Sequence, residues 1–240
     1  MKKHFLLIFA FFVFSICVFT NNYHISSFSL ENIIFPDGSM QVYEKIEYEF
    51  DYDYRGLKRY LPKARYVTIE DLKIWAEGLP VTEKDFSVNN EREFDVSVWL
   101  VPYKSPFKVD HKRFPKLVLN IMYTAKYIVE DGVDCSQLFR QFWGSGWDVP
   151  AYNVEVKFVF PSNIFPNQYY IHADFENIVN VVGNVFTLKA EEITAYTYGE
   201  VRFVFDAPIE EEYTVKNSTL TKEVIEKVEN EYKEQKEQKE

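Results

Sequence analysis

Three aspartates and two tryptophans lie together in the middle of the sequence, in a pattern typical of carbohydrate chemistry. Asp131, Asp134 and Asp148 flank a segment that contains Trp143 and Trp147. A glycosidase uses paired carboxylates as acid and base, and a sugar-binding groove would place aromatic rings beside them. The alternative is that the aspartates cap turns and the two indoles pack over the edge of a sheet. The pattern favours this second interpretation.

A second group with chemical potential is the basic cluster of Arg55, Lys58 and Arg59, which lies in an otherwise acidic sequence. Arginine offers a planar fork that grips a carboxylate with two hydrogen bonds. This cluster could therefore bind a carboxylate or an anionic glycan. The alternative, which we favour, is ion pairing with acidic residues nearby. The candidate partners are Asp51, Asp53 and Glu70.

The other reactive residues indicate no catalytic or metal site. The four histidines are His4, His24, His111 and His172, and no two of them have metal-ligand spacing. The sequence also lacks Gly-x-Ser-x-Gly, a phosphate-binding glycine loop and His-Glu-x-x-His. Cys135 is predicted to be a small buried residue rather than a nucleophile. We therefore expect no catalytic residue, no metal and no cofactor, while the abundant carboxylates leave a paired acid and base open.

The aromatic and basic residues instead predict a contact surface built from two loops, one over residues 52–59 and one over residues 143–147. Tyrosine and tryptophan on loops of a rigid scaffold offer a large contact area at low entropic cost. The surface requires that both loops meet at one end of the fold. The residues expected on it are Tyr52, Tyr54, Arg55, Arg59, Trp143, Trp147 and Asp148.

Composition and charge exclude one class of partner. The 240 residues carry a formal net charge of −10, and removing Lys2 and Lys3 with residues 1–20 leaves 25 basic against 37 acidic residues, or −12. An acidic surface repels phosphate backbones, so we expect no nucleic-acid partner. The 47% of hydrophobic residues is enough for a sizeable core.

The strand pattern predicts an all-β chain. Apolar residues alternate with a period of two along residues 117–129 and again along residues 154–160. Pro36 to Ser39 predicts the turn of an opening hairpin, and Gly183-Asn184 predicts a second hairpin turn. Residues 23–208 are therefore expected to form a β-sandwich, immunoglobulin-like or related. One sandwich or two stacked sandwiches divided near residue 148 both fit this length.

The two ends of the sequence differ from the domain between them. Lys2 and Lys3 precede an apolar run, so residues 1–20 predict a leader helix that acts as a signal peptide or a signal anchor. Residues 209–240 are expected to be a linker and a charged helical tail. A narrow apolar stripe marks this tail, which is either a solvated helix or a partner contact. Asn217 begins a possible N-glycosylation site. The stripe comprises Leu220, Val224, Val228 and Tyr232.

Residues 54–62 read Tyr-Arg-Gly-Leu-Lys-Arg-Tyr-Leu-Pro, and residues 123–161 run from a Tyr-x-x-x-Tyr strand through an acidic turn and an aromatic loop to a strand that ends in proline. Together with the opening hairpin and its Asp-Gly-Ser turn, these stretches resemble the domain-of-unknown-function family 2207, the predicted membrane proteins. The resemblance covers roughly residues 23 to 207. It implies an extracytoplasmic β-rich domain, usually followed by transmembrane helices. This chain departs from that pattern, because no segment after Thr20 is expected to span a bilayer.

The combined features predict an exported or membrane-anchored binding or assembly module without enzymatic activity. We expect it at the outer face of the cytoplasmic membrane or outside the cell, attached to the membrane through its N-terminal segment. Its expected partner is a membrane or cell-envelope protein. One alternative is a carbohydrate-binding or carbohydrate-active protein, which requires an exposed Trp143 or Trp147. The other is an extracytoplasmic subunit of a membrane complex, which uses the tail helix as its docking element.

Overall fold

The computed structural model describes residues 23–61, 66–79, 86–89, 94–99 and 108–238. The predicted leader lies outside these residues. Fifteen strands and one helix follow one another along the described part of the chain. The strands are β1 (Tyr23–Ile34), β2 (Met40–Phe50), β3 (Gly56–Leu61), β4 (Thr68–Glu77), β5 (Phe86–Asn89), β6 (Phe94–Trp99), β7 (Lys116–Lys126), β8 (Val129–Asp131), β9 (Ser136–Trp143), β10 (Ala151–Val159), β11 (Gln168–Ala173), β12 (Ile178–Val182), β13 (Val185–Ile193), β14 (Gly199–Phe205) and β15 (Thr214–Lys216), and the helix is α1 (Lys222–Glu237).

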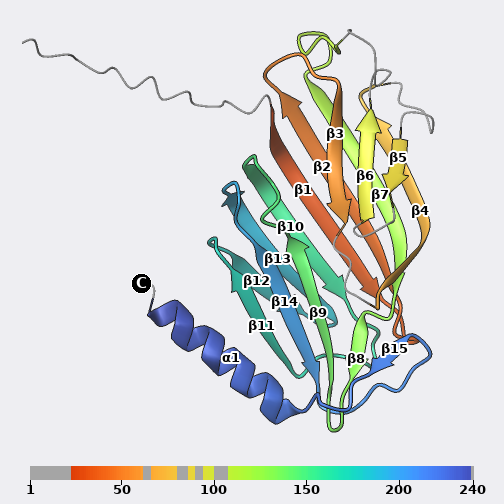
Figure 1. Ribbon diagram of the computed structural model, residues 1–240, viewed down its shortest axis with the longest axis vertical. Helices are drawn as coiled ribbons and strands as arrows, with labels where there is room; N and C mark the ends of the chain where they lie inside the picture. The colour runs from red at the N-terminus through yellow and green to blue at the C-terminus, as the bar shows by residue number, and fades with distance from the viewer. Residues whose placement is uncertain (1–22, 62–65, 80–85, 90–93, 100–107, 239–240) are drawn as a thin grey trace, which may run out of the picture.

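Most of these strands belong to two mixed sheets (Figure 1). The larger sheet has the order β12-β13-β10-β1-β2-β7-β4, and the smaller has the order β11-β14-β9-β8-β15. β3, β6 and β5 form a third sheet. β1 pairs in parallel with β10 on one side and antiparallel with β2 on the other. The strands before and after residue 148 therefore share one sheet.

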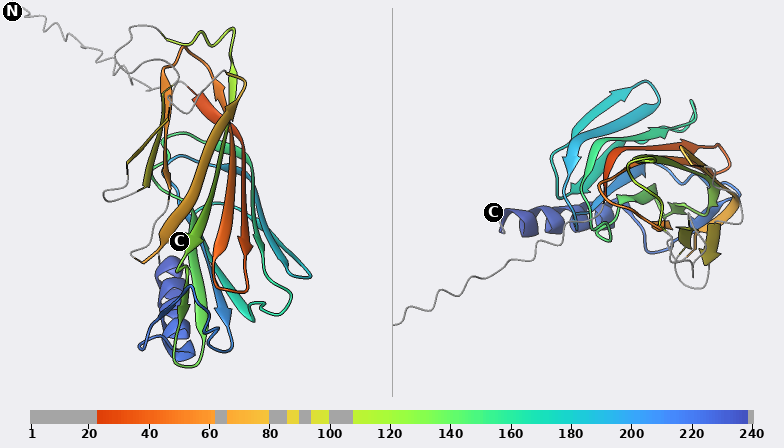
Figure 2. Two further views of the ribbon diagram at one scale, coloured as in Figure 1. Left: turned by 90° about the vertical axis from the view of Figure 1, so that its right-hand side faces the viewer. Right: turned by 90° about the horizontal axis from the view of Figure 1, so that it is seen from above.

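Aromatic side chains join the inner faces of the two larger sheets into one core. The ring of Phe158 on β10 lies 4.8 Å from that of Phe203 on β14, and Phe28 on β1 meets Trp143 on β9 at 5.1 Å. The long strands run along the length of the molecule, and β1 begins at the end opposite to α1 (Figure 2). The predictions of a β-rich chain and of a C-terminal helix are confirmed.

Both predicted hairpin turns are confirmed, and each contains a glycine with a positive φ angle. Gly38 lies between β1 and β2 with φ +82°, and Gly183 lies between β12 and β13 with φ +58°. Both values are in the left-handed region, where glycine carries no Cβ penalty. These turns help to fix the register of the two hairpins, which buries the alternate apolar residues of β1, β2 and β13, while most of β12 stays exposed.

One predicted loop is wrong, because residues 136–143 form strand β9 rather than an aromatic connection. Leu138, Arg140 and Phe142 point inward, while Phe139 and Gln141 face outward. The arginine in the middle of the inward set interrupts the apolar alternation that would have identified the strand. Long-range pairing with β14 holds it in place.

The tail packs through only part of the predicted stripe, because Leu220 is buried and Tyr232 contacts His172 while the two valines between them do not pack. Val224 and Val228 are exposed, whereas Ile225 and Glu229 are buried. Glu229 turns inward because its carboxylate pairs with His172 on β11 at 2.6 Å and with Arg202 on β14 at 2.7 Å. An ionic contact that links elements distant in the sequence therefore sets the rotation of the helix.

His172 is the centre of this helix contact. Its Nε2 donates to Glu229 at 2.6 Å and its Nδ1 donates to Glu200 at 3.1 Å, and its ring lies 4.1 Å from that of Tyr232. Burial alone would lower the pKa of His172, but the hydrogen bonds to Glu200 and Glu229 outweigh it and raise this pKa to about 9. His172 is thus a buried cation held between two carboxylates at neutral pH.

Candidate functional site

The basic cluster is built around a buried ion pair between Arg59 on β3 and Glu44 on β2. Arg59 Nε donates to Glu44 Oε2 at 2.8 Å, and Arg59 Nη2 donates to Glu44 Oε1 at 3.1 Å. Both side chains are buried, with exposed fractions of 5% for Arg59 and 0% for Glu44. Arg59 therefore forms an ion pair, as the preferred interpretation of the cluster predicted. The acidic partner of Arg59 is Glu44, which was not among the three candidate partners named from the sequence.

Trp147 covers this ion pair from the side of the β9–β10 connection. The Arg59 guanidinium lies 5.1 Å from the centre of the Trp147 ring, a cation–π distance. Trp147 in turn stacks on Trp143, with the ring centres 5.0 Å apart and an angle of 14° between the planes. Trp143 is 0% exposed and Trp147 is 7% exposed. The contact between β3 and the β9–β10 connection is therefore held by a charge and two stacked indoles.

A cleft of about 620 Å³ opens beside this contact, and we call it the Arg59 cleft. Buried and exposed side chains alternate along β3, which forms one wall of the cleft. Arg59 and Leu61 point inward, whereas Lys58 and Tyr60 point outward and Tyr60 is 47% exposed. The lining comprises Tyr23, Lys58, Arg59, Tyr60, Leu61, Gln141, Gly144, Ser145, Gly146, Trp147 and Asp148.

The structure brings together three of the seven predicted contact residues in this cleft, namely Arg59, Trp147 and Asp148. Trp143 lies behind Trp147 in the core. Tyr54 is also buried, where it stacks on Phe50 at 3.4 Å and donates a hydrogen bond to the carbonyl of Phe114.

The remaining two predicted residues, Tyr52 and Arg55, are not part of the cleft lining. Tyr52 is 54% exposed, and its ring lies 6.4 Å from that of His111. The sequence reasoning missed Tyr23, Tyr60 and Gln141. The period of two within β3 was the signal that could have assigned Tyr60 to the exposed face.

The three aspartates do not form a shared catalytic groove. Asp131 and Asp134 lie at the start of β9 and Asp148 lies beyond its end, and eight strand residues span roughly 26 Å at about 3.3 Å each. Because both indoles are also buried, neither of them offers the exposed aromatic platform expected for a carbohydrate site. In the fold, the three aspartates are therefore separated along β9, and the two indoles are covered by other residues.

Asp131 caps a turn, as the preferred interpretation predicted. Its Oδ1 accepts a hydrogen bond from Ser136 Oγ at 2.6 Å, and its Oδ2 accepts one from Thr214 Oγ1 at 2.6 Å. The backbone amides of Ile209 and Glu210 donate to it as well, each at 3.0 Å. Burial acts to raise the pKa of Asp131, but these hydrogen bonds outweigh it and hold the pKa below its usual value.

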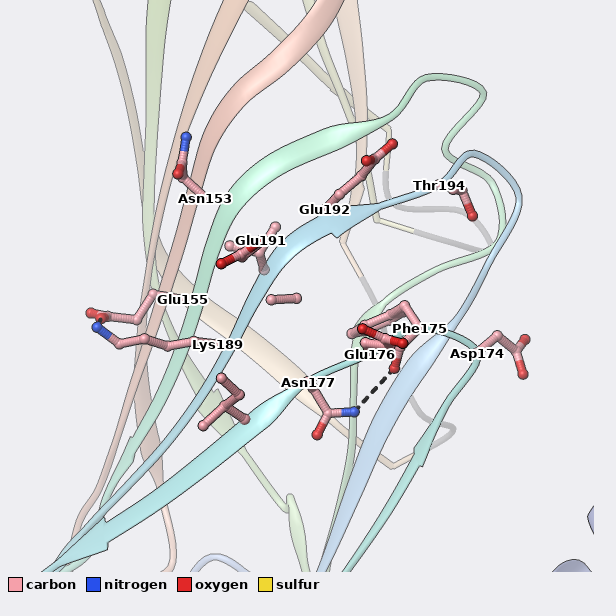
Figure 3. A pocket seen from close by; sticks show the side chains of 13 residues that line it. Asn153, Glu155, Asp174, Phe175, Glu176, Asn177, Lys189, Glu191, Glu192 and Thr194 are labelled. Carbon is pink, nitrogen blue, oxygen red and sulfur yellow. Dashed lines mark hydrogen bonds and ion pairs between the residues drawn. The ribbon is translucent and has the colours of Figure 1, made fainter.

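A second cleft, of about 1070 Å³, lies beside β10 and β13, and five of its thirteen lining residues are acidic (Figure 3). Glu155 on β10 pairs with Lys189 on β13 at 2.8 Å. Within the described ranges, only Asp53, Asp110 and His111 bring three ligand atoms close enough for a metal, and they are outside this cleft. The cleft is an acidic surface that disfavours anionic ligands. Its carboxylates are Glu155, Asp174, Glu176, Glu191 and Glu192.

Two further predicted residues have structural partners. Cys135 is buried, and burial together with Asp134 raises the pKa of its thiol to about 11, which disfavours the nucleophilic thiolate. The Asn217 amide donates to Glu130 Oε2 at 3.0 Å, while Asn217 Oδ1 accepts from Thr219 Oγ1 at 2.8 Å. Glycosylation at Asn217 stays a prediction, and a glycan there would replace the contact with Glu130.

Comparison with known proteins places this fold in a family. The model of the family described as "Predicted membrane protein (DUF2207) N-terminal domain" matches residues 24–205, and the chain belongs to this family. A search of curated proteins found no match. Within the described ranges, no helix has both the length and the apolar character needed to cross a bilayer.

Solved structures that resemble the chain share only a distant likeness. Native leukotriene A4 hydrolase from Saccharomyces cerevisiae aligns with a TM-score of 0.44 and 10% identity, over 76% of this chain and 29% of the hydrolase. An M1 zinc metallopeptidase from Deinococcus radiodurans aligns with a TM-score of 0.41 and 11% identity, over 76% of this chain and 42% of the peptidase. The chain spans less than half the length of either protein. Likeness at this level supports no conclusion about activity.

Proposed function

We propose that the chain is an exported, membrane-anchored binding or assembly module without enzymatic activity, and that the Arg59 cleft is its contact surface. The proposed attachment is the N-terminal segment, and the proposed location is the outer face of the cytoplasmic membrane. Membership of a family of predicted membrane proteins supports this location. The two sheets packed over one core support classification as a β-sandwich.

The observation that carries the proposed binding role is the meeting of two chain segments at one cleft. β3 and the β9–β10 connection are more than eighty residues apart, yet Arg59 and Trp147 lie in cation–π contact. The buried pair below the cleft gives a fixed base, and Tyr60 and Lys58 stand outward from it. Exposed aromatic and cationic side chains on a rigid base are typical of protein contact surfaces. The proposed partner is a membrane or cell-envelope protein.

A second candidate is a subunit role in which α1 docks on a membrane complex. Val224 and Val228 favour it, because they remain 45% and 43% exposed on the side of the helix that faces away from the sheets. Deleting residues 218–240 would then remove the co-purified proteins while the Arg59 cleft stays intact.

Photo-cross-linking tests the proposed contact surface. A photoreactive amino acid at Tyr60 should cross-link the full chain to a discrete partner in intact cells, because this side chain stands at the rim of the cleft. The same replacement at Tyr169 on β11 is a matched control, since Tyr169 has a similar exposed fraction of 44%. Equal cross-linking from both positions, or none from Tyr60, would contradict the proposal.

A further inference from the structure

Arg140 on β9 is a buried cation with too few partners. Its exposed fraction is 6%. Its Nη2 donates to the hydroxyl of Tyr123 on β7 at 2.7 Å, and its Nε has no hydrogen-bond partner among the described residues. Burial raises the pKa of Tyr123, so its hydroxyl is neutral and supplies no negative charge. The guanidinium of an arginine stays charged, and the buried Nε–H of Arg140 has no acceptor among the described residues.

The neighbouring carboxylate does not compensate for this charge. Both oxygens of Glu44 are occupied by Arg59, so no carboxylate among the described residues forms an ion pair with Arg140. A buried charge without a counter-ion is strongly unfavourable. Unfavourable polar groups of this kind are often found where a ligand completes the site.

A pocket of about 320 Å³ lies beside Arg140, and we call it the Arg140 pocket. Two carboxylates are among its lining residues, and both already accept hydrogen bonds. Glu130 accepts from Gln137 and Asn217, and Glu200 accepts from His172. Apart from these two carboxylates, Arg140 and Gln141, the lining consists of aliphatic and aromatic side chains. The lining residues are Tyr66, Val67, Tyr127, Ile128, Glu130, Leu138, Phe139, Arg140, Gln141 and Glu200.

The same pocket borders a free strand edge. β8 pairs with β9 only at Ser136, Gln137 and Leu138, while β14 pairs along the whole of β9 on the other side. Within the described ranges, residues 139–143 therefore have a ladder on one side only. Unpaired backbone groups at such an edge accept an added strand from another segment.

We propose that the Arg140 pocket binds a carboxylate carried by an extended polypeptide segment, which adds to the free edge of β9 and pairs its carboxylate with Arg140. The backbone of the added segment hydrogen-bonds to the unpaired edge of β9, and its carboxylate serves as the counter-ion of Arg140. The Arg140 pocket adjoins the Arg59 cleft and shares Gln141 with it, but the two proposals depend on different side chains, Arg140 and Tyr60, so either can fail while the other holds.

Peptide binding to the purified full chain tests this site. The probes are a capped pentapeptide Val-Thr-Glu-Thr-Val, the same peptide with Gln in place of Glu, and sodium acetate alone. The Glu peptide should bind, and the Gln peptide should bind roughly 10- to 100-fold more weakly, because a charge-assisted pair is lost. Arg140→Met should weaken the Glu peptide by a similar factor. Arg113→Met, a change of a surface arginine, should leave binding unaltered.

Thermal unfolding of the free chain separates a ligand site from a purely structural arginine. Arg140→Met should leave the melting temperature unchanged or raised, because it removes an uncompensated buried charge. A lowered melting temperature together with equal binding of the Glu and Gln peptides would overturn the proposal. Stabilisation by acetate without binding of either peptide would also overturn it, in favour of a small free carboxylate.

Discussion

Replacing Glu44 with alanine should lower the free energy of unfolding by about 3–5 kcal/mol, because it leaves Arg59 buried without a counter-ion. Glu44 lies on β2 with 0% exposure, and both of its oxygens accept hydrogen bonds from Arg59. The loss should also release β3 from the larger sheet and open the Arg59 cleft. Urea denaturation of the purified chain measures the change.

The double variant Glu44→Leu/Arg59→Met is the control for this prediction. Replacing both members of a buried ion pair with apolar residues of similar size is often neutral or stabilising. The double variant should therefore recover most of the stability that Glu44→Ala loses. A cost below about 1 kcal/mol for Glu44→Ala would place the pair among exposed ion pairs and contradict the description of a buried anchor.

His172→Gln should lower the stability by about 2–4 kcal/mol near neutral pH, because the buried Glu229 then keeps Arg202 as its cationic partner but loses the second cation at its other carboxylate oxygen. The stability depends on pH because the pKa of His172 is about 9 in the folded chain and about 6.5 in the unfolded chain. A raised pKa gives stability that is fully present below pH about 6.5 and is lost as the pH rises through about 9.

Thermal unfolding between pH about 6.5 and about 9.5 tests this helix contact. The parent chain should lose stability across this interval, and His172→Gln should lose less. His24→Gln is a suitable control, because His24 is half-buried and lies 4.0 Å from Glu49. An identical pH profile for the parent chain and His172→Gln would show that His172 is uncharged in the fold.

Much of the β structure follows from local patterns in the sequence. The opening hairpin and its glycine turn are both recovered. Alternation of apolar residues also predicts β7 and β10, but the run predicted along residues 117–129 is divided, because β7 ends at Lys126, Tyr127 has φ +61° and β8 begins at Val129. These features depend on side-chain period and turn chemistry, which short stretches of sequence contain.

The parts that the sequence reasoning missed depend on long-range ionic contacts. Glu44 occupies an inward position between Val42 and Ile46, yet its partner Arg59 lies on another sheet. Arg140 likewise interrupts the apolar face of β9, and Glu229 rotates α1 away from its apolar stripe. A charged residue at an inward position was the available signal, but the partner of each charge depends on the tertiary fold.

The candidate contact surface was predictable only in part. Arg59 and Trp147 were both expected on it, and they do meet at the cleft. They contribute a buried base rather than the exposed surface, because strand alternation directs Tyr60 outward in place of Arg59. Composition thus identified the two segments, but the predicted loop over residues 52–59 is wrong in its second half, because strand β3 begins at Gly56. Which side chains reach solvent required the structure.

The central claim is that this domain works outside the cytoplasmic membrane with the Arg59 cleft open to solvent. Ser145→Cys places an exposed thiol in that cleft, while the native Cys135 is buried and unreactive by comparison. A membrane-impermeant maleimide should label the Ser145→Cys chain in intact cells as fully as in lysed cells, and well above the parent chain. Labelling that appears only after lysis would place the domain inside the cell and contradict the proposed function.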